Sequence, residues 1–237
     1  MLREARLKRE PEVVKGFRIR GREVTRLESF SDTVFGFALT LLVVSLDVPK
    51  NFDELLQTMR GFVAFGICFA ILAGIWNHHY VFCRRFGLDD GFVRFLTCVM
   101  LFIVLLYVYP LKFLFTLFVN GVLYDVPAKL TSSQASTLFL IYGLGFAAVY
   151  LALAALNWHA YHRSAELEFS PREKFESRWE IYAMLIHAGV GLSSAVVAVT
   201  LPPRYIAFAG FVYFGIALLM AMHRLAARKH RRQLQDA

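Results

Sequence analysis

Long runs of uncharged, mostly apolar residues constrain this chain more than any other feature. Four runs carry no Asp, Glu, Lys or Arg: 61–83, 130–162, 181–203 and 205–223. A fifth run, 95–111, continues past Lys112 to position 124. Because a helix needs about 20 residues to cross roughly 30 Å of hydrocarbon, runs of this length are typical of membrane-spanning helices.

Composition supports the same interpretation. Of the 237 residues, 57% are apolar, and the mean hydropathy is +0.51, which exceeds that of soluble domains of this size. No segment alternates like a barrel strand, and a helix satisfies its own backbone groups in lipid. We therefore predict an all-α integral membrane bundle. Its six helices are expected at Glu28–Val48, Gly61–Cys83, Gly91–Phe118, Ser136–Ala160, Ile181–Thr200 and Pro203–Arg224.

The basic residues predict how this bundle is oriented. Of the 26 Lys and Arg residues, 21 fall at the chain ends or in every second loop, and five fall on the opposite side. By the positive-inside rule both termini then lie in the cytoplasm. One six-helix transmembrane domain at 28–224 would be flanked by a basic cytoplasmic segment at 1–27 and a basic cytoplasmic tail at 225–237. The net charge of +8 fits contact with anionic membrane lipids, and no nucleic-acid partner is expected.

The first predicted helix is unusual because its apolar stretch is short. Only 14 residues, 33–46, separate Asp32 from Asp47, which gives about 21 Å of helix. If this helix spans the membrane, Ser31 and Asp32 must lie inside the membrane-embedded region. An ionisable group there needs a partner or an aqueous path, so Asp32 is a candidate functional residue.

A helical wheel divides this first helix into two faces. Asp32 and Leu39 point away from the apolar face. The residues that share the apolar face are Thr33, Phe37, Thr40, Leu41, Val44 and Val48. The helix is therefore expected to serve two purposes, one on each side.

A cluster of polar side chains in the second predicted helix lies at the same depth as Asp32. Its members are Trp76, Asn77, His78 and His79. In an antiparallel hairpin their indole, amide and imidazole groups could satisfy the Ser31 hydroxyl and the Asp32 carboxylate. One interpretation is a brace between the two helices, and the other is a proton relay or metal site, since imidazoles titrate and bind metals.

These two segments carry a family resemblance. The stretch from Arg26 to Asp32 has the form RxxxFSD and continues as TVFGFALTLLVV, while positions 76–79 read WNHH. The pair resembles the first- and second-helix motifs of the transmembrane protein 175 family of potassium channels, in its prokaryotic single-repeat form. Six helices, cytoplasmic termini and chain length agree with that form.

The resemblance implies a potassium-selective or potassium-preferring channel in a bacterial or archaeal cell membrane. Four copies would form a homotetramer around a pore lined by the first helix, whose hydrophobic constriction acts as a gate. The implied pore-lining and selectivity residues are Phe37, Thr40, Leu41 and Val44. The implied helix-bracing network consists of Arg26, Phe30, Ser31, Asp32, Trp76, Asn77, His78 and His79. Family members tend to have Ile or Leu at the position of Phe37, and ordinary helix packing is the alternative role for the pore-lining set.

Other function classes receive less support from the sequence. A haem-binding membrane redox protein would pair His78 or His79 with one of His159, His162 and His187, but their spacing gives no convincing ligand set. A proton-coupled transporter remains a further alternative, although no paired broken helices are visible. No nucleophile elbow, protease motif or Cys-x-x-Cys pair occurs, so we expect no enzyme, no metal and no cofactor.

Overall fold

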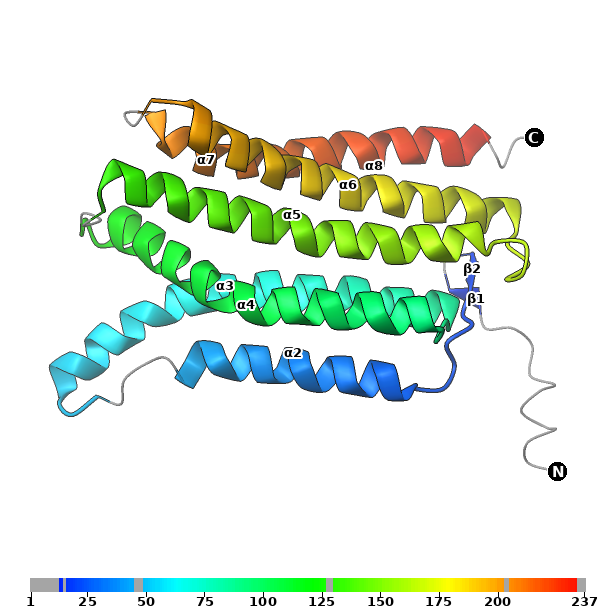
Figure 1. Ribbon diagram of the computed structural model, residues 1–237, viewed down its shortest axis with the longest axis horizontal. Coiled ribbons are helices and arrows are strands. Elements are labelled where there is room, and N and C mark those ends of the chain that lie inside the picture. The colour runs from blue at the N-terminus through cyan, green and yellow to red at the C-terminus, as the bar shows by residue number, and fades with distance from the viewer. Residues whose placement is uncertain (1–12, 15, 45–48, 127–129, 203–204, 234–237) are drawn as a thin grey trace.

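The computed structural model describes residues 13–14, 16–44, 49–126, 130–202 and 205–233. Long helices run side by side in it, with α2 at one edge of the bundle and α8 at the other (Figure 1). A short hairpin of two antiparallel strands precedes α2. In chain order the elements are β1 (Val13–Val14), β2 (Phe17–Arg18), α2 (Arg26–Val44), α3 (Phe52–Phe86), α4 (Gly91–Leu123), α5 (Ser132–His162), α6 (Pro171–Thr200), α7 (Ala207–Phe211), the 3-10 turn η2 (Val212–Phe214) and α8 (Gly215–Gln233).

Five helical segments in the described part of the chain are long and apolar enough to cross a membrane. They are α3, α4, α5, α6 and the run from Ala207 to Arg231. The 19-residue helix α2 is not among them. It would reach about 28 Å, and it carries Arg26, Glu28 and Asp32. Five of the six predicted spans thus have membrane-length helices, and the sixth, through α2, stays a prediction.

Several helices begin earlier than predicted. The prediction was wrong by nine residues at the start of α3 and by ten at the start of α6. Each start has a side-chain cap: Asn51 accepts a hydrogen bond from the Glu54 amide, and Ser170 accepts one from the Glu173 amide. An uncharged run marks only the part of a helix that lipid surrounds, whereas capping residues mark where the backbone turns into a helix. Positions 45–48, where the first helix was expected to end, lie outside the described residues.

Helices α5 and α6 approach each other through small residues. A Cβ atom on Gly143 would lie 2.6 Å from the Gly191 carbonyl oxygen, and one on Gly191 would lie 2.8 Å from the Gly143 oxygen. Ala147 and Ala195 follow each glycine by one turn and continue the contact. Close approach of this kind stabilises helix pairs in membranes, where the hydrophobic effect supplies little driving force.

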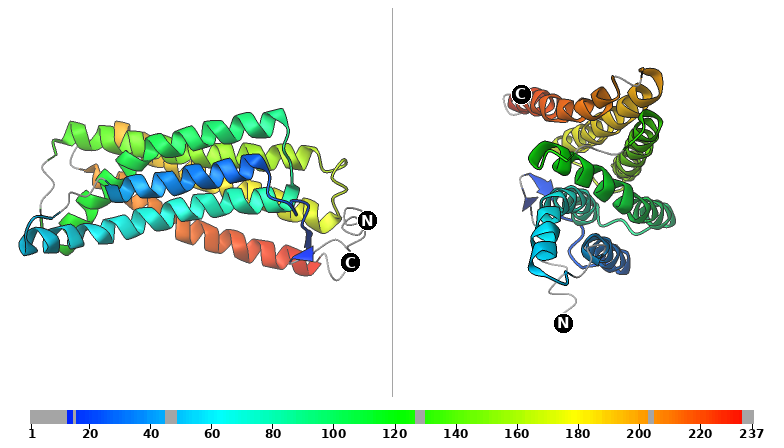
Figure 2. Two further views of the ribbon diagram at one scale, coloured as in Figure 1. Left: turned by 90° about the horizontal axis from the view of Figure 1, so that it is seen from below. Right: turned by 90° about the vertical axis from the view of Figure 1, so that its left-hand side faces the viewer.

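The ends of α3, α5 and α8 and the starts of α2, α4 and α6 gather at one end of the bundle, which we call the basic end (Figures 1 and 2). The residues that precede α2 are docked there. Phe17 is 3% exposed and packs edge-on against the rings of Phe86 and Phe169 at 5.6 and 6.0 Å between ring centroids. This docking was not expected from the sequence, which suggested a basic segment only.

Arg20 completes the docked segment, and we call Phe17 to Gly21 with its partners the N-terminal anchor. The Arg20 guanidinium donates to the Leu167 carbonyl at 2.8 Å and to the buried Glu173 carboxylate at 2.9 Å. Glu173 also accepts the backbone N–H of Arg18 at 2.9 Å. The Gly21 amide then bonds the Arg84 carbonyl at 3.0 Å. The anchor thus ties the segment before α2 to both α3 and α6.

Candidate functional site

Helix α2 has one covered and one uncovered face. It begins after Thr25, whose hydroxyl accepts the Glu28 amide at 3.1 Å, and it packs on α3 and α4. The described residues of α2 that are buried are Leu27, Glu28, Ser31, Phe35, Ala38 and Leu42. Phe37 lies on the other side of α2 and is 58% exposed. Thr33, Gly36 and Thr40 are exposed on the same side.

Two threonines on this uncovered face present oxygen atoms as acceptors. The Thr33 hydroxyl donates to the Ser29 carbonyl at 2.8 Å, and the Thr40 hydroxyl donates to the Phe37 carbonyl at 2.7 Å. Since each hydroxyl hydrogen is held by its own helix, the lone pairs of the oxygen remain to accept a bond or to face a cation. The uncovered face therefore combines an aromatic ring at Phe37 with acceptor oxygens nearby.

The other two predicted pore-lining residues, Leu41 and Val44, are not seen as exposed side chains on this face. Leu41 is half-buried and packs partly against the core. Val44 is the last residue of α2, and its side chain lies outside the described part of the structure. Leu39, which the wheel placed away from this face, is half-buried against the core.

A direct hydrogen bond joins the two motif-bearing helices. The indole N–H of Trp76 in α3 donates to the Asp32 carboxylate at 2.7 Å. The Trp76 ring also stacks on Tyr80, with centroids 5.5 Å apart and the planes at 26°. A charged acceptor strengthens such a hydrogen bond. The bond therefore links the first half of α2 to α3 at a position ten residues before α3 ends.

His79 of α3 packs against the covered face of α2. Its side chain is 1% exposed, and its ring lies 6.5 Å from the ring of Phe35, which belongs to the covered face of α2. The Thr97 hydroxyl and the Cys83 sulfur lie 3.5 and 3.8 Å from His79 ring nitrogens. His79 therefore contacts α2 by packing rather than through Asp32.

The other predicted bracing residues are not brought to Asp32. The Ser31 hydroxyl donates to Leu27 in its own helix at 2.8 Å. His78 faces α6, where its Nδ1 lies 3.4 Å from Glu180. Three further members, Arg26, Phe30 and Asn77, are exposed. The spacing of polar residues predicted their depth, but it did not predict which neighbour each residue would find.

One further contact to α2 was missed from the sequence. Lys112 of α4 donates through its Nζ to the Leu42 carbonyl at 2.9 Å, close to the end of α2. Carbonyls in the last turn of a helix have no partner within the helix, and a cation there also complements the helix dipole. A lysine that interrupts an otherwise apolar run was the available signal.

The remaining histidines are engaged in local contacts. His159 bonds Asp90 at 2.8 Å, and Asp90 caps α4 by accepting the amides of Phe92 and Val93. Although partial burial acts to raise the pKa of Asp90, the bonds from Val93 and His159 outweigh it and hold that pKa below its usual value.

His187 and His162, the other candidate haem ligands, also have neighbours of their own. His187 stacks on Tyr150 at 4.4 Å between centroids, and the ring of His162 lies 4.8 Å from that of Trp158. Within the described residues no group of three or more His, Cys, Asp and Glu side chains could hold a metal ion.

A bundle of membrane-length helices defines an integral membrane protein. Comparison with known proteins places it more closely. Residues 26–107 match the family model described as endosomal/lysosomal potassium channel TMEM175. A potassium channel from Marivirga tractuosa is 34% identical over 233 residues, which cover 93% of this chain and 94% of the relative. One from Streptomyces collinus is 30% identical over 158 residues, covering 63% and 69%.

Two solved structures are also similar to this chain. A variant of the potassium channel MtTMEM175, crystallised with a nanobody–MBP fusion, matches with a TM-score of 0.80 at 31% identity and covers 91% of this chain and 99% of that one. A TMEM175 homologue from Chamaesiphon minutus, at 20% identity and a TM-score of 0.54 over 85% and 96%, shares the fold. The chain belongs to the TMEM175 family of potassium channels, as its RxxxFSD and WNHH motifs indicated. Proteins of this family are ion channels and not enzymes.

Proposed function

We propose that this chain is the subunit of a homotetrameric, potassium-preferring channel whose pore is lined by α2. The observation that carries the proposal is the uncovered face of α2, where Phe37 and Thr40 point away from the chain's own helices. An apolar ring beside acceptor oxygens suits contact with a partly dehydrated cation. The basic end would face the cytoplasm of a bacterial or archaeal cell, and α2 would be the sixth span.

In this proposal Phe37 forms the constriction. Four rings around one axis would narrow the path, and wetting of that narrow zone would control conduction. The Thr40 oxygens, one turn further along α2, would replace water lost by the ion. Leu41 and Val44 would form outer rings. Lys112 and the Trp76–Asp32 bond would hold α2 in place from behind.

Ion flux through proteoliposomes tests this function. Liposomes that contain the purified protein should release potassium several times faster than they release sodium, when loaded with one ion or the other. Liposomes without protein should release neither ion. A parallel measurement with caesium would rank the ions by ease of dehydration. Equal rates with and without protein, or an assembly other than a tetramer by native mass spectrometry, would contradict the proposal.

The brace gives a separate prediction. Changing Trp76→Phe keeps the ring but leaves the Asp32 carboxylate without its indole donor, a loss of about 1.5–3 kcal/mol for a charged hydrogen bond. We expect the tetramer fraction to fall about tenfold at a fixed detergent concentration, measured by size-exclusion chromatography. The matched control is Trp158→Phe, because Trp158 is 51% exposed on α5. Intact tetramers with an altered pH dependence of flux would instead favour a titrating role for Asp32.

A further inference from the structure

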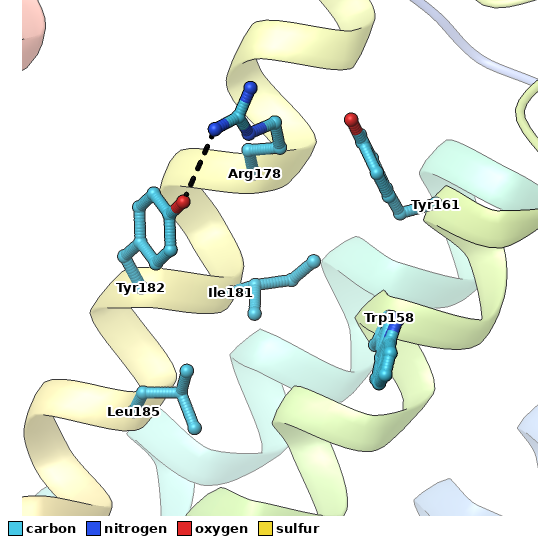
Figure 3. A pocket seen from close by; sticks show the side chains of 6 residues that line it. All are labelled: Trp158, Tyr161, Arg178, Ile181, Tyr182 and Leu185. Atoms are coloured by element: carbon cyan, nitrogen blue, oxygen red, sulfur yellow. Dashed lines mark hydrogen bonds between the residues drawn. The ribbon is translucent and has the colours of Figure 1, made fainter.

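A groove of about 280 Å³ lies between α5 and α6, away from α2. Figure 3 shows its lining, with aromatic side chains from α5 facing a mixed row from α6. The lining residues are Trp158, Tyr161, Arg178, Ile181, Tyr182 and Leu185. Helix α2 packs on α3 and α4 and lies at the other edge of the bundle (Figure 1). The groove is therefore separate from the candidate pore.

The groove is lined mainly by apolar surface, and polar groups lie at one end of it. Arg178 and the hydroxyl of Tyr161 lie together at the end nearer the basic end, whereas Leu185 lies at the opposite end (Figure 3). Arg178 and Leu185 are seven positions apart in α6, which corresponds to about 10 Å along the helix axis. A molecule with a charged head and an apolar tail would match this order.

The charge at the polar end is not neutralised by the protein. Among the described residues, Arg178 has no carboxylate within 4.0 Å, and it donates instead to the Tyr182 hydroxyl at 3.3 Å. Other arginines at the basic end do have such partners: Arg163 pairs with Asp90, and Arg85 pairs with Glu180. Arg178 is also exposed. It thus offers a guanidinium that is held in place and open to an anion.

The tryptophans indicate where the membrane surface crosses the bundle. All three lie within about three turns of a helix end at the basic end. Trp76 precedes the end of α3 by ten residues, Trp158 precedes the end of α5 by four, and Trp179 follows the start of α6 by eight. Tryptophan and tyrosine collect at the level of lipid headgroups. This level includes the polar end of the groove.

From these observations we propose that the groove binds an anionic phospholipid of the leaflet at the basic end. The lipid phosphate accepts hydrogen bonds from the Arg178 guanidinium, whose planar donor group suits phosphate oxygens. One acyl chain lies along Ile181 and Leu185 and against the Trp158 ring. The net negative headgroup complements the basic residues near the helix ends gathered there, which include Arg84, Arg94, Lys174 and Arg228.

Lipid retention measured by native mass spectrometry tests this site. The tetramer would be released from mixed micelles that contain equal amounts of phosphatidylglycerol and phosphatidylcholine. We expect the wild type to retain phosphatidylglycerol preferentially and Arg178→Gln to retain about tenfold less. The matched control is Lys174→Gln, which removes the same charge from an exposed position one turn earlier in α6 and outside the groove. Both positions are exposed, so both variants should fold.

A second measurement locates the acyl chain. Phosphatidylglycerol brominated on its acyl chain should quench the fluorescence of Trp158. The fraction of tryptophan fluorescence that is quenched should therefore be smaller in Trp158→Phe than in the wild type. Equal retention by wild type and Arg178→Gln, or an equal loss in Lys174→Gln, would overturn the proposal. Equal retention of phosphatidylcholine would overturn the anionic preference, and a Trp158 shielded from brominated lipid would mean that a second copy of the chain covers the groove.

Discussion

Phe37→Ala is expected to raise ion flux through the reconstituted channel by roughly tenfold and to reduce its preference for potassium over sodium. In the proposed tetramer, replacing four phenyl rings by methyl groups would widen the constriction and let water enter it, so the barrier to a hydrated ion would fall. A fall of about 1.4 kcal/mol in that barrier corresponds to the tenfold increase. Paired potassium and sodium efflux assays in liposomes would measure both effects.

The control for this variant is another exposed phenylalanine far from α2. Phe214→Ala removes a ring that is 67% exposed in η2, near α8 at the opposite edge of the bundle. Its flux and ion preference should match those of the wild type. If Phe37→Ala leaves both quantities unchanged, then Phe37 does not line the pore and its face of α2 packs against lipid or protein.

Glu173→Ala is expected to cause the largest loss of stability. Its carboxylate is 1% exposed and holds both the Arg20 guanidinium and the Arg18 amide. Removing one partner of a buried ion pair leaves the other charge uncompensated, which costs about 3–5 kcal/mol. For a chain of this length that corresponds to a fall of roughly 10 °C in the melting temperature, measured by tryptophan fluorescence in detergent.

A surface glutamate in the same region provides the comparison. The Glu168 side chain is 80% exposed and lies 3.7 Å from Arg18. Because exposed ion pairs contribute little, Glu168→Ala should shift the melting temperature by no more than about 1–2 °C. Equal effects of the two substitutions would show that the N-terminal anchor is not held by the buried pair.

The sequence was most informative about features that depend on local periodicity. Uncharged runs located the five membrane-length helices, because a charged side chain in lipid is costly in any sequence context. The helical wheel placed Phe37 and Thr40 together on one face of the first helix, and both are exposed in the structure. Trp76 and Asp32 were also predicted to lie at the same depth, and they form a hydrogen bond in the structure.

Contacts between distant segments could not be predicted in this way. The bond from Lys112 to Leu42 joins residues 70 positions apart, and the contact of Gly143 with Gly191 depends on how two whole helices approach. His78 could have faced α2 or α6 at the same depth, and only the packing decides that it faces Glu180. Helix starts were predictable in principle, since Asn51, Thr131 and Ser170 each precede a Glu or Gln by three residues.

The N-terminal anchor has a consequence for the order in which the chain is assembled during synthesis. Arg20 bonds Leu167 and Glu173, which follow it by 147 and 153 positions. At typical translation rates of about 5–20 residues per second, these partners are synthesised roughly 7–30 s after Arg20. If α2 spans the membrane as proposed, it is synthesised before its Arg20 partners in 167–173 exist. A ribosome that stops before α6 would therefore leave the segment before α2 held by its contacts with α3 alone, without the buried Glu173 pair.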